Sequence, residues 1–220
     1  MRPVWAVLAV VSAVHLVAQL VDPEGSVAGA SQVLLMPALA GALLSVAPSR
    51  QHRLVRLTLL ALAFSWLGDT LPRFVGGDAA FLVLVGAFLL AQLTYAVAFL
   101  PYWRGSIVRR RPILLLPYAA GLARVVAASH ARAGSLLVPL ILYGLALGTM
   151  AVLATGLGWL AGLGGALFVL SDSLIALNSF ADVSLPAHPF WVMLTYITGQ
   201  TLLVLAVLRV AGEARPRRGR

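Results

Sequence analysis

The chain has 220 residues, of which 61% are hydrophobic and only 10% are charged, and its mean hydropathy is +0.97. This composition excludes a soluble domain of useful size, because nearly the whole chain lies in apolar runs that could cross a hydrocarbon core of about 30 Å. The net charge of +9 comes from arginines in short loops and a tail. Membrane topology and contact with anionic lipids explain these charges, so we expect no nucleic-acid partner.

The apolar runs predict eight membrane-spanning helices, because lipid offers no hydrogen-bond partner to an open backbone. They fall at residues 3–21, 27–47, 54–75, 79–100, 112–129, 134–155, 157–181 and 189–209. The first run is too long for a cleaved signal peptide, so we expect it to be retained. The predicted fold is therefore an all-α polytopic membrane protein, with a single transmembrane domain over residues 1–210 and a basic cytoplasmic tail over 211–220.

Arginine placement predicts the orientation of these helices. With eight spans, both ends and every second loop share one side of the membrane, and thirteen of the sixteen arginines fall on that side. Only Arg73 and Arg132 lie in the opposite loops, while Arg124 lies within the fifth span. The positive-inside rule then places both termini in the cytoplasm. The chain has arginine but no lysine, which we attribute to the codon bias of a GC-rich bacterial genome. We therefore expect the protein to lie in a bacterial inner membrane.

Two aspartates, Asp69 and Asp172, lie inside apolar spans, where a carboxylate is costly and usually marks a functional site. The third span runs outward from about Arg56, so Asp69 lies about 20 Å along it at 1.5 Å per residue. The seventh runs outward from about Gly158, which places Asp172 about 21 Å along. Both carboxyls should therefore lie at one level in the outer half of the membrane, lining one cavity within about 10 Å of each other.

The two aspartates also hint at an internal repeat. They occupy matching positions in a four-plus-four division, and a glutamine near a tyrosine follows each one a helix later. A parallel repeat of this kind would bring the third and seventh helices together at the centre, with the aspartates facing each other. The match is a few residues long, so chance similarity stays open.

Four segments together resemble the YhhN family of integral membrane proteins. They are "SWLGD" in the third span, "GAFLLAQLTYAVAF" in the fourth, "GALFVLSDSLIALNSF" in the seventh and "TYITGQTLLV" in the eighth. The resemblance implies a lysoplasmalogenase, which hydrolyses the vinyl ether bond of an alkenyl-glycerophosphoethanolamine or alkenyl-glycerophosphocholine to a fatty aldehyde and a glycerophosphodiester. Its substrate would be a single-chain ether phospholipid, surrounded by membrane lipids, and assembly into a homo-oligomer stays open.

The resemblance also assigns residues. Its motif acids fall on Asp69 and Asp172, which we expect to be catalytic. The substrate-binding candidates are polar residues of the last spans and the fourth: Gln92, Tyr95, Asn178, Tyr196 and Gln200. Interhelical hydrogen bonding is an open alternative for Gln92, Tyr95, Asn178 and Gln200. Three positions depart from the family's pattern, which often has Lys at Met36, His at Gln92 and a second Tyr at Ile197.

Vinyl ether chemistry suits two carboxyl groups independently of the resemblance. The bond opens by protonation of the outer alkene carbon, which needs one protonated acid, and the resulting cation needs a carboxylate that also activates water. No His, Asp and Glu cluster has metal-ligand spacing, and no G-x-S-x-G elbow is present, so we expect no metal, no cofactor and no serine nucleophile.

Two alternatives to this interpretation remain. Arg73 lies one helical turn beyond Asp69 and could form an i,i+4 ion pair that makes this aspartate structural. In the other alternative, the protein is a proton-coupled transporter or a non-enzymatic lipid-binding protein whose aspartates relay protons or bind a cation.

The charge pattern predicts that the C-terminus lies in the cytoplasm. A reporter enzyme that works in the cytoplasm should therefore be active when it is fused after Arg220, and one that works only outside the cytoplasm should be inactive there. Fusions in the loops around Asp22 and Asp182 should report the opposite side. A C-terminal fusion that is active only outside the cytoplasm would contradict the predicted orientation.

Overall fold

The computed structural model describes residues 3–213, and within this range every regular element is helical. The long helices are α1 (Pro3–Val21), α2 (Ser26–Val46), α3 (Arg53–Thr70), α4 (Gly77–Phe99), α6 (Leu115–Ala133), α7 (Leu137–Ala154), α8 (Trp159–Ala181) and α9 (His188–Glu213). A short helix, α5 (Ile107–Arg110), lies between α4 and α6. The 3-10 turns are η1 (Leu71–Phe74), η2 (Leu100–Gly105), η3 (Pro112–Leu114), η4 (Gly134–Leu136) and η5 (Thr155–Leu157).

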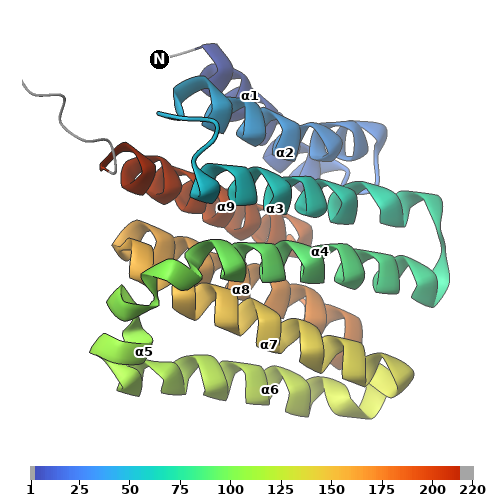
Figure 1. Cartoon of the computed structure of the whole chain (residues 1–220). Coiled ribbons are helices and arrows are strands. Elements are labelled where there is room, and N and C mark those ends of the chain that lie inside the picture. Colours follow the sequence, from blue (N-terminus) through green and yellow to red (C-terminus); the bar gives the residue numbers. More distant parts are fainter. Residues whose placement is uncertain (1–2, 214–220) are drawn as a thin grey trace, which may run out of the picture.

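The helices lie side by side and reverse direction at each connection, with α1 and α2 at one edge of the bundle and α6 at the other (Figure 1). The centre is formed by α9, which packs against α8, α1, α2 and α3, and by α8, which also contacts α6 and α7. α4 bridges the two halves because it packs against both α3 and α7.

Length and composition identify a multi-pass membrane protein. Seven helical stretches in the described range are long and apolar enough to cross a bilayer. One of them, Pro112–Leu157, is longer than a single crossing needs and reverses at η4 into α6 and α7 (Figure 1). Large apolar side chains such as Val10, Val21 and Ile113 are exposed on the outside of the bundle, as expected for surfaces that face lipid.

The predicted spans differ from the helices mainly at their ends. The α-helical part of the third span stops at Thr70, because Pro72 lacks the N–H that would continue the ladder, and the chain enters η1. The last helix continues to Glu213, so the predicted tail at 211–220 begins inside α9, and residues 214–220 lie outside the described part. The short helix α5 was not predicted.

The symmetry argument expected the third and seventh helices to pack together centrally. Instead, α3 packs mainly against α2, α4 and α9, whereas α8 packs mainly against α6, α7 and α9. The centre of the bundle is thus the α8–α9 pair, because two glycines let these backbones approach closely. The four-plus-four repeat stays a prediction.

The close approach of α8 and α9 depends on Gly164 and Gly199. A Cβ added at Gly199 would lie 2.9 Å from the Gly164 carbonyl oxygen, whereas one added at Gly86 on α4 would have no atom within 4 Å. We therefore expect Gly199→Ala to lower the free energy of unfolding by about 1–3 kcal/mol through overpacking. Gly86→Ala should be neutral or stabilising by up to about 1 kcal/mol. Thermal unfolding of both variants in one detergent checks this, and equal midpoints would contradict it.

Candidate active site

A cavity of about 320 Å³ opens at the end of the bundle that carries η1. Side chains from α2, η1, α3, α4, α8 and α9 line it: Gln32, Gly68, Asp69, Pro72, Arg73, Leu84, Phe88, Ser171, Asp172, Ile175, Val192, Met193 and Tyr196. Both sequence-predicted aspartates are in this lining, so the two helices bring them to one cavity as expected. Of the lining residues, Arg73 is exposed, whereas the others are buried or half-buried.

Asp69 lies near the end of α3 and is 7% exposed. The Tyr196 hydroxyl donates to its Oδ2 at 2.9 Å, and the Gln32 amide donates from Nε2 to its Oδ1 at 3.3 Å. Each carboxylate oxygen therefore has a partner from another helix, which offsets part of the cost of burying the group.

Arg73 reaches Asp69 only through an intermediate. Its Nη2 donates to Gln32 Oε1 at 2.5 Å, and Gln32 in turn donates to Asp69. Among the ion pairs of residues 3–213, none joins these two residues, so the i,i+4 pair of the structural alternative is not formed. The reason is local: α3 ends at Thr70, so Arg73 lies in η1 and no longer follows α-helical spacing.

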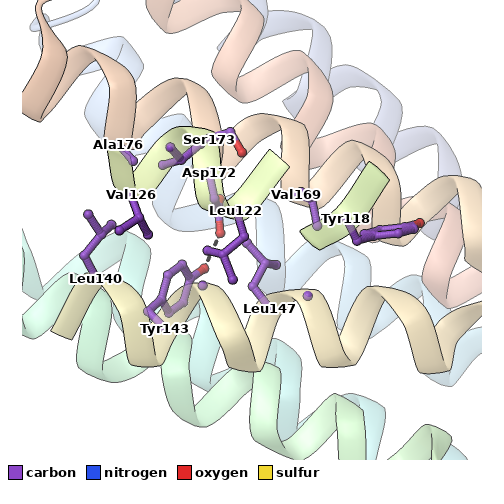
Figure 2. A pocket seen from close by; sticks show the side chains of 13 residues that line it. Tyr118, Leu122, Val126, Leu140, Tyr143, Leu147, Val169, Asp172, Ser173 and Ala176 are labelled. Atoms are coloured by element: carbon purple, nitrogen blue, oxygen red, sulfur yellow. Dashed lines mark hydrogen bonds between the residues drawn. The ribbon is translucent and has the colours of Figure 1, made fainter. Parts of the chain in front are cut away.

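Asp172 is held from the other side of the cavity. The Tyr143 hydroxyl on α7 donates to Asp172 Oδ2 on α8, and the two side chains point toward each other (Figure 2). The Gln92 amide on α4 donates from Nε2 to the Tyr143 hydroxyl at 3.5 Å. Gln92 is fully buried and outside the cavity lining, so it acts on the site through Tyr143.

The other predicted binding residues lie apart from the cavity. The Tyr95 hydroxyl donates to Gln200 Oε1 at 2.7 Å, and Gln200 Nε2 donates to Ser65 Oγ at 3.0 Å. Tyr95 and Gln200 are fully buried, so these bonds tie α4, α9 and α3 together beneath the cavity. Asn178 lies on the exposed surface of α8, outside the lining. Of the five predicted binding residues, Tyr196 alone is in the lining.

Sequence reasoning missed Gln32 and Tyr143. Each is a polar side chain inside an apolar run, and that signal alone would have placed both among the candidates. The departures from the family pattern are buried near the site: Met36 is 2% exposed and follows Gln32 by one helical turn, and Ile197 adjoins Tyr196. Both pack in the main apolar core.

The arrangement can perform acid–base chemistry. Two carboxyl groups line one cavity, each oriented by a tyrosine hydroxyl, and a guanidinium lies at its exposed side. Apolar walls such as Leu84, Phe88 and Ile175 lower the polarity around the carboxyls, which strengthens electrostatic interactions inside. Among the described residues, no three His, Asp or Glu side chains are grouped closely enough to hold a metal ion.

Comparison with known proteins gives a consistent set of relatives. The sequence model of the YhhN family matches residues 27–207. The chain is 35% identical over 175 residues to human "Lysoplasmalogenase TMEM86B", covering 78% of this chain and 71% of the human protein. It is 33% identical over 153 residues to the rat protein of the same name, covering 68% of this chain and 65% of the relative. No solved structure matches the chain.

The Tyr143–Asp172 bond predicts a difference between two tyrosines on neighbouring helices. Tyr143→Phe removes the partner of Asp172 and of the Gln92 amide, and should lower the free energy of unfolding by about 1–3 kcal/mol. Tyr118→Phe on α6 is the control, because the Tyr118 hydroxyl has no hydrogen-bond partner among the described residues. Thermal unfolding in detergent measures both, and a larger loss for Tyr118→Phe would contradict the assigned role of Tyr143.

Proposed function

Because the chain belongs to the YhhN family, we propose that it is a lysoplasmalogenase-like membrane hydrolase that cleaves the vinyl ether bond of a lysoplasmalogen. The names of its mammalian relatives support this activity. The observation that carries the proposal is the cavity shared by Asp69 and Asp172, because two carboxyls in an apolar site are the groups that this reaction requires.

The reaction proceeds by proton transfer to carbon. One aspartic acid donates a proton to the outer alkene carbon, which gives an oxocarbenium ion at the carbon that carries the ether oxygen. The other aspartate stabilises this cation and removes a proton from the attacking water, so that a hemiacetal forms. In the collapse of the hemiacetal, the first aspartate takes the proton of the hemiacetal hydroxyl as the bond from carbon to the glycerol oxygen breaks. The second aspartic acid gives its proton to the departing oxygen, so that an aldehyde and the glycerol hydroxyl form. In sum, one water is consumed and both carboxyl groups return to their starting states.

The neighbouring side chains have supporting roles in this proposal. Tyr196 and Tyr143 fix the orientation of the two carboxyls, and Gln92 positions Tyr143. The Gln32–Arg73 pair at the exposed side of the cavity suits the phosphodiester of an ethanolamine or choline headgroup, because guanidinium and phosphate attract. Tyr95 and Gln200 support the helices beneath the cavity, and Asn178 lies too far along α8 to contribute to it.

The topology completes the proposal. We propose eight membrane crossings with both termini in the cytoplasm, which places the cavity in the outer half of a bacterial inner membrane. Two observations support it: the reversal at η4 divides Pro112–Leu157 into two antiparallel helices, and the arginine-rich loops gather at the end of the bundle opposite η1. The mammalian origin of the relatives does not bear on the host of this chain.

A transporter or non-enzymatic lipid-binding protein is the alternative. Detergent-solubilised protein distinguishes them, because an enzyme releases aldehyde from lysoplasmalogen without a gradient, whereas a transporter needs sealed vesicles. The saturated-ether analogue is the substrate control, since it lacks the alkene that is protonated. Aldehyde from lysoplasmalogen alone supports the enzyme, and none from either lipid contradicts it.

Replacing either aspartate by asparagine should abolish this activity. Asp69→Asn and Asp172→Asn keep an oxygen that accepts the tyrosine hydrogen bond but cannot transfer a proton, so we expect kcat to fall more than about a hundredfold while the fold is kept. Asp78→Asn, in the exposed first turn of α4, is the control. Aldehyde release and thermal unfolding are measured together. A folded Asp172→Asn protein with near-full activity would refute the two-carboxyl mechanism.

A further inference from the structure

Asp172 also lines a second cavity, on the side facing away from Asp69. This cavity lies between α6, α7 and α8, and apart from Tyr143, Asp172 and Ser173 its walls are almost entirely apolar (Figure 2). It shares Tyr118, Leu122, Gly144 and Gly148 with a larger groove of about 380 Å³ between α6 and α7. Because these four residues line both, we treat the two as one apolar path that starts at Asp172, and we call it the α6–α7 groove.

The α6–α7 groove runs along α7, away from Arg73. It extends from Tyr143 beside Asp172 to Val152 near η5, a distance of about 14 Å at 1.5 Å per residue. η5 packs against η2, at the end of the bundle opposite η1 (Figure 1). About 14 Å is close to half of the roughly 30 Å hydrocarbon core, and so to the length of one lipid chain.

The missing side chain at Gly148 keeps this path open, because a Cβ added there would have no atom within 4 Å. Gly144, one turn earlier on the same face of α7, instead gives room to the Leu122 side chain of α6, which would lie 2.4 Å from an added Cβ. α6 covers the groove but is loosely packed, since Ser129 and Ala133 near its end are its only buried residues in the described structure. An apolar chain could therefore enter from the lipid between α6 and α7 without displacing a buried core.

We propose that the α6–α7 groove binds the hydrocarbon chain of the substrate and that Gly148 sets the chain length it accepts. The inference rests on the proposed function and adds a binding mode to it. Asp172 lines both the polar cavity and the groove, so a lipid with its headgroup at Gln32 and Arg73 and its chain along α7 places the first bonds of the chain at the carboxyl. In a vinyl ether lipid, those bonds are the ones that react.

The groove suits a single chain, because its room lies between α6 and α7 and its walls offer apolar contact without charged groups beyond Asp172. In the proposed topology, the orientation of the groove also matches a lipid of the outer leaflet. Its polar end lies at η1, and its apolar end runs toward η5 at the opposite end of the bundle.

The test compares Gly148→Leu with Gly86→Leu, a glycine on α4 that is exposed and equally free of neighbours. Lysoplasmalogens with an octadecenyl and a pentenyl chain are the substrates. The added side chain lies about 7 Å from Tyr143 along α7, so it should block the long chain and spare the short one. For Gly148→Leu, we expect kcat/KM to fall at least about tenfold with the octadecenyl lipid, because several methylenes lose their burial. With the pentenyl lipid, whose chain ends before Gly148, we expect a fall of less than about threefold. Gly86→Leu should change neither.

A binding measurement with the non-cleavable saturated-ether lysolipids of both chain lengths separates this inference from the proposed activity. If the wild type binds these lipids and Gly148→Leu weakens the long one selectively, the groove is supported even when no aldehyde forms, and the hydrolase proposal alone fails. Equal effects of Gly148→Leu on both chain lengths, or no effect on either, would overturn the groove. Absence of binding to the wild type would overturn it as well.

Discussion

The structure depends on one constraint, which is the cost of placing carboxyl groups among apolar helices. Each buried aspartate is compensated by a tyrosine hydroxyl from another helix: Tyr196 on α9 for Asp69, and Tyr143 on α7 for Asp172. These bonds fix the register of α3 against α9 and of α7 against α8, because a shift by one residue would leave a carboxyl without its partner. The chemistry of the site and the packing of the bundle are therefore set by the same contacts.

The hydrogen bonds around the two carboxyls differ in a way that suits unequal roles. Asp69 has two donors and lies within one intermediate of a guanidinium, whereas Asp172 has one tyrosine donor and faces an apolar groove. Two hydrogen-bond donors and a nearby guanidinium, as at Asp69, stabilise the charged form of a carboxyl group. Apolar surroundings, as at Asp172, destabilise the uncharged form less than the charged form. In the proposed mechanism, this asymmetry favours Asp172 as the proton donor and Asp69 as the carboxylate.

The sequence predicted the helices and the catalytic candidates better than their partners. Long apolar runs locate helices directly, and an aspartate inside such a run is conspicuous, so the helical class and the pairing of Asp69 with Asp172 in one cavity could be anticipated. The hydrogen-bond partners of the aspartates depend on which helices become neighbours in space. The pattern of apolar residues along the chain does not give this information. Tyr143 and Gln32 were therefore missed, and Tyr95 and Gln200 turned out to bond to each other. The end of α3 at Thr70 likewise removed Arg73 from the helical spacing that would have allowed an ion pair with Asp69.

The most direct test of the central claim is the origin of the atoms in the products. If Asp69 and Asp172 protonate carbon and activate water, hydrolysis in deuterium oxide followed by immediate borohydride trapping should place one deuterium on the carbon next to the former aldehyde group. In water labelled with heavy oxygen, the glycerol hydroxyl should keep the oxygen of the original ether. An aldehyde without deuterium at that carbon, or heavy oxygen in the glycerophosphodiester hydroxyl, would contradict the account.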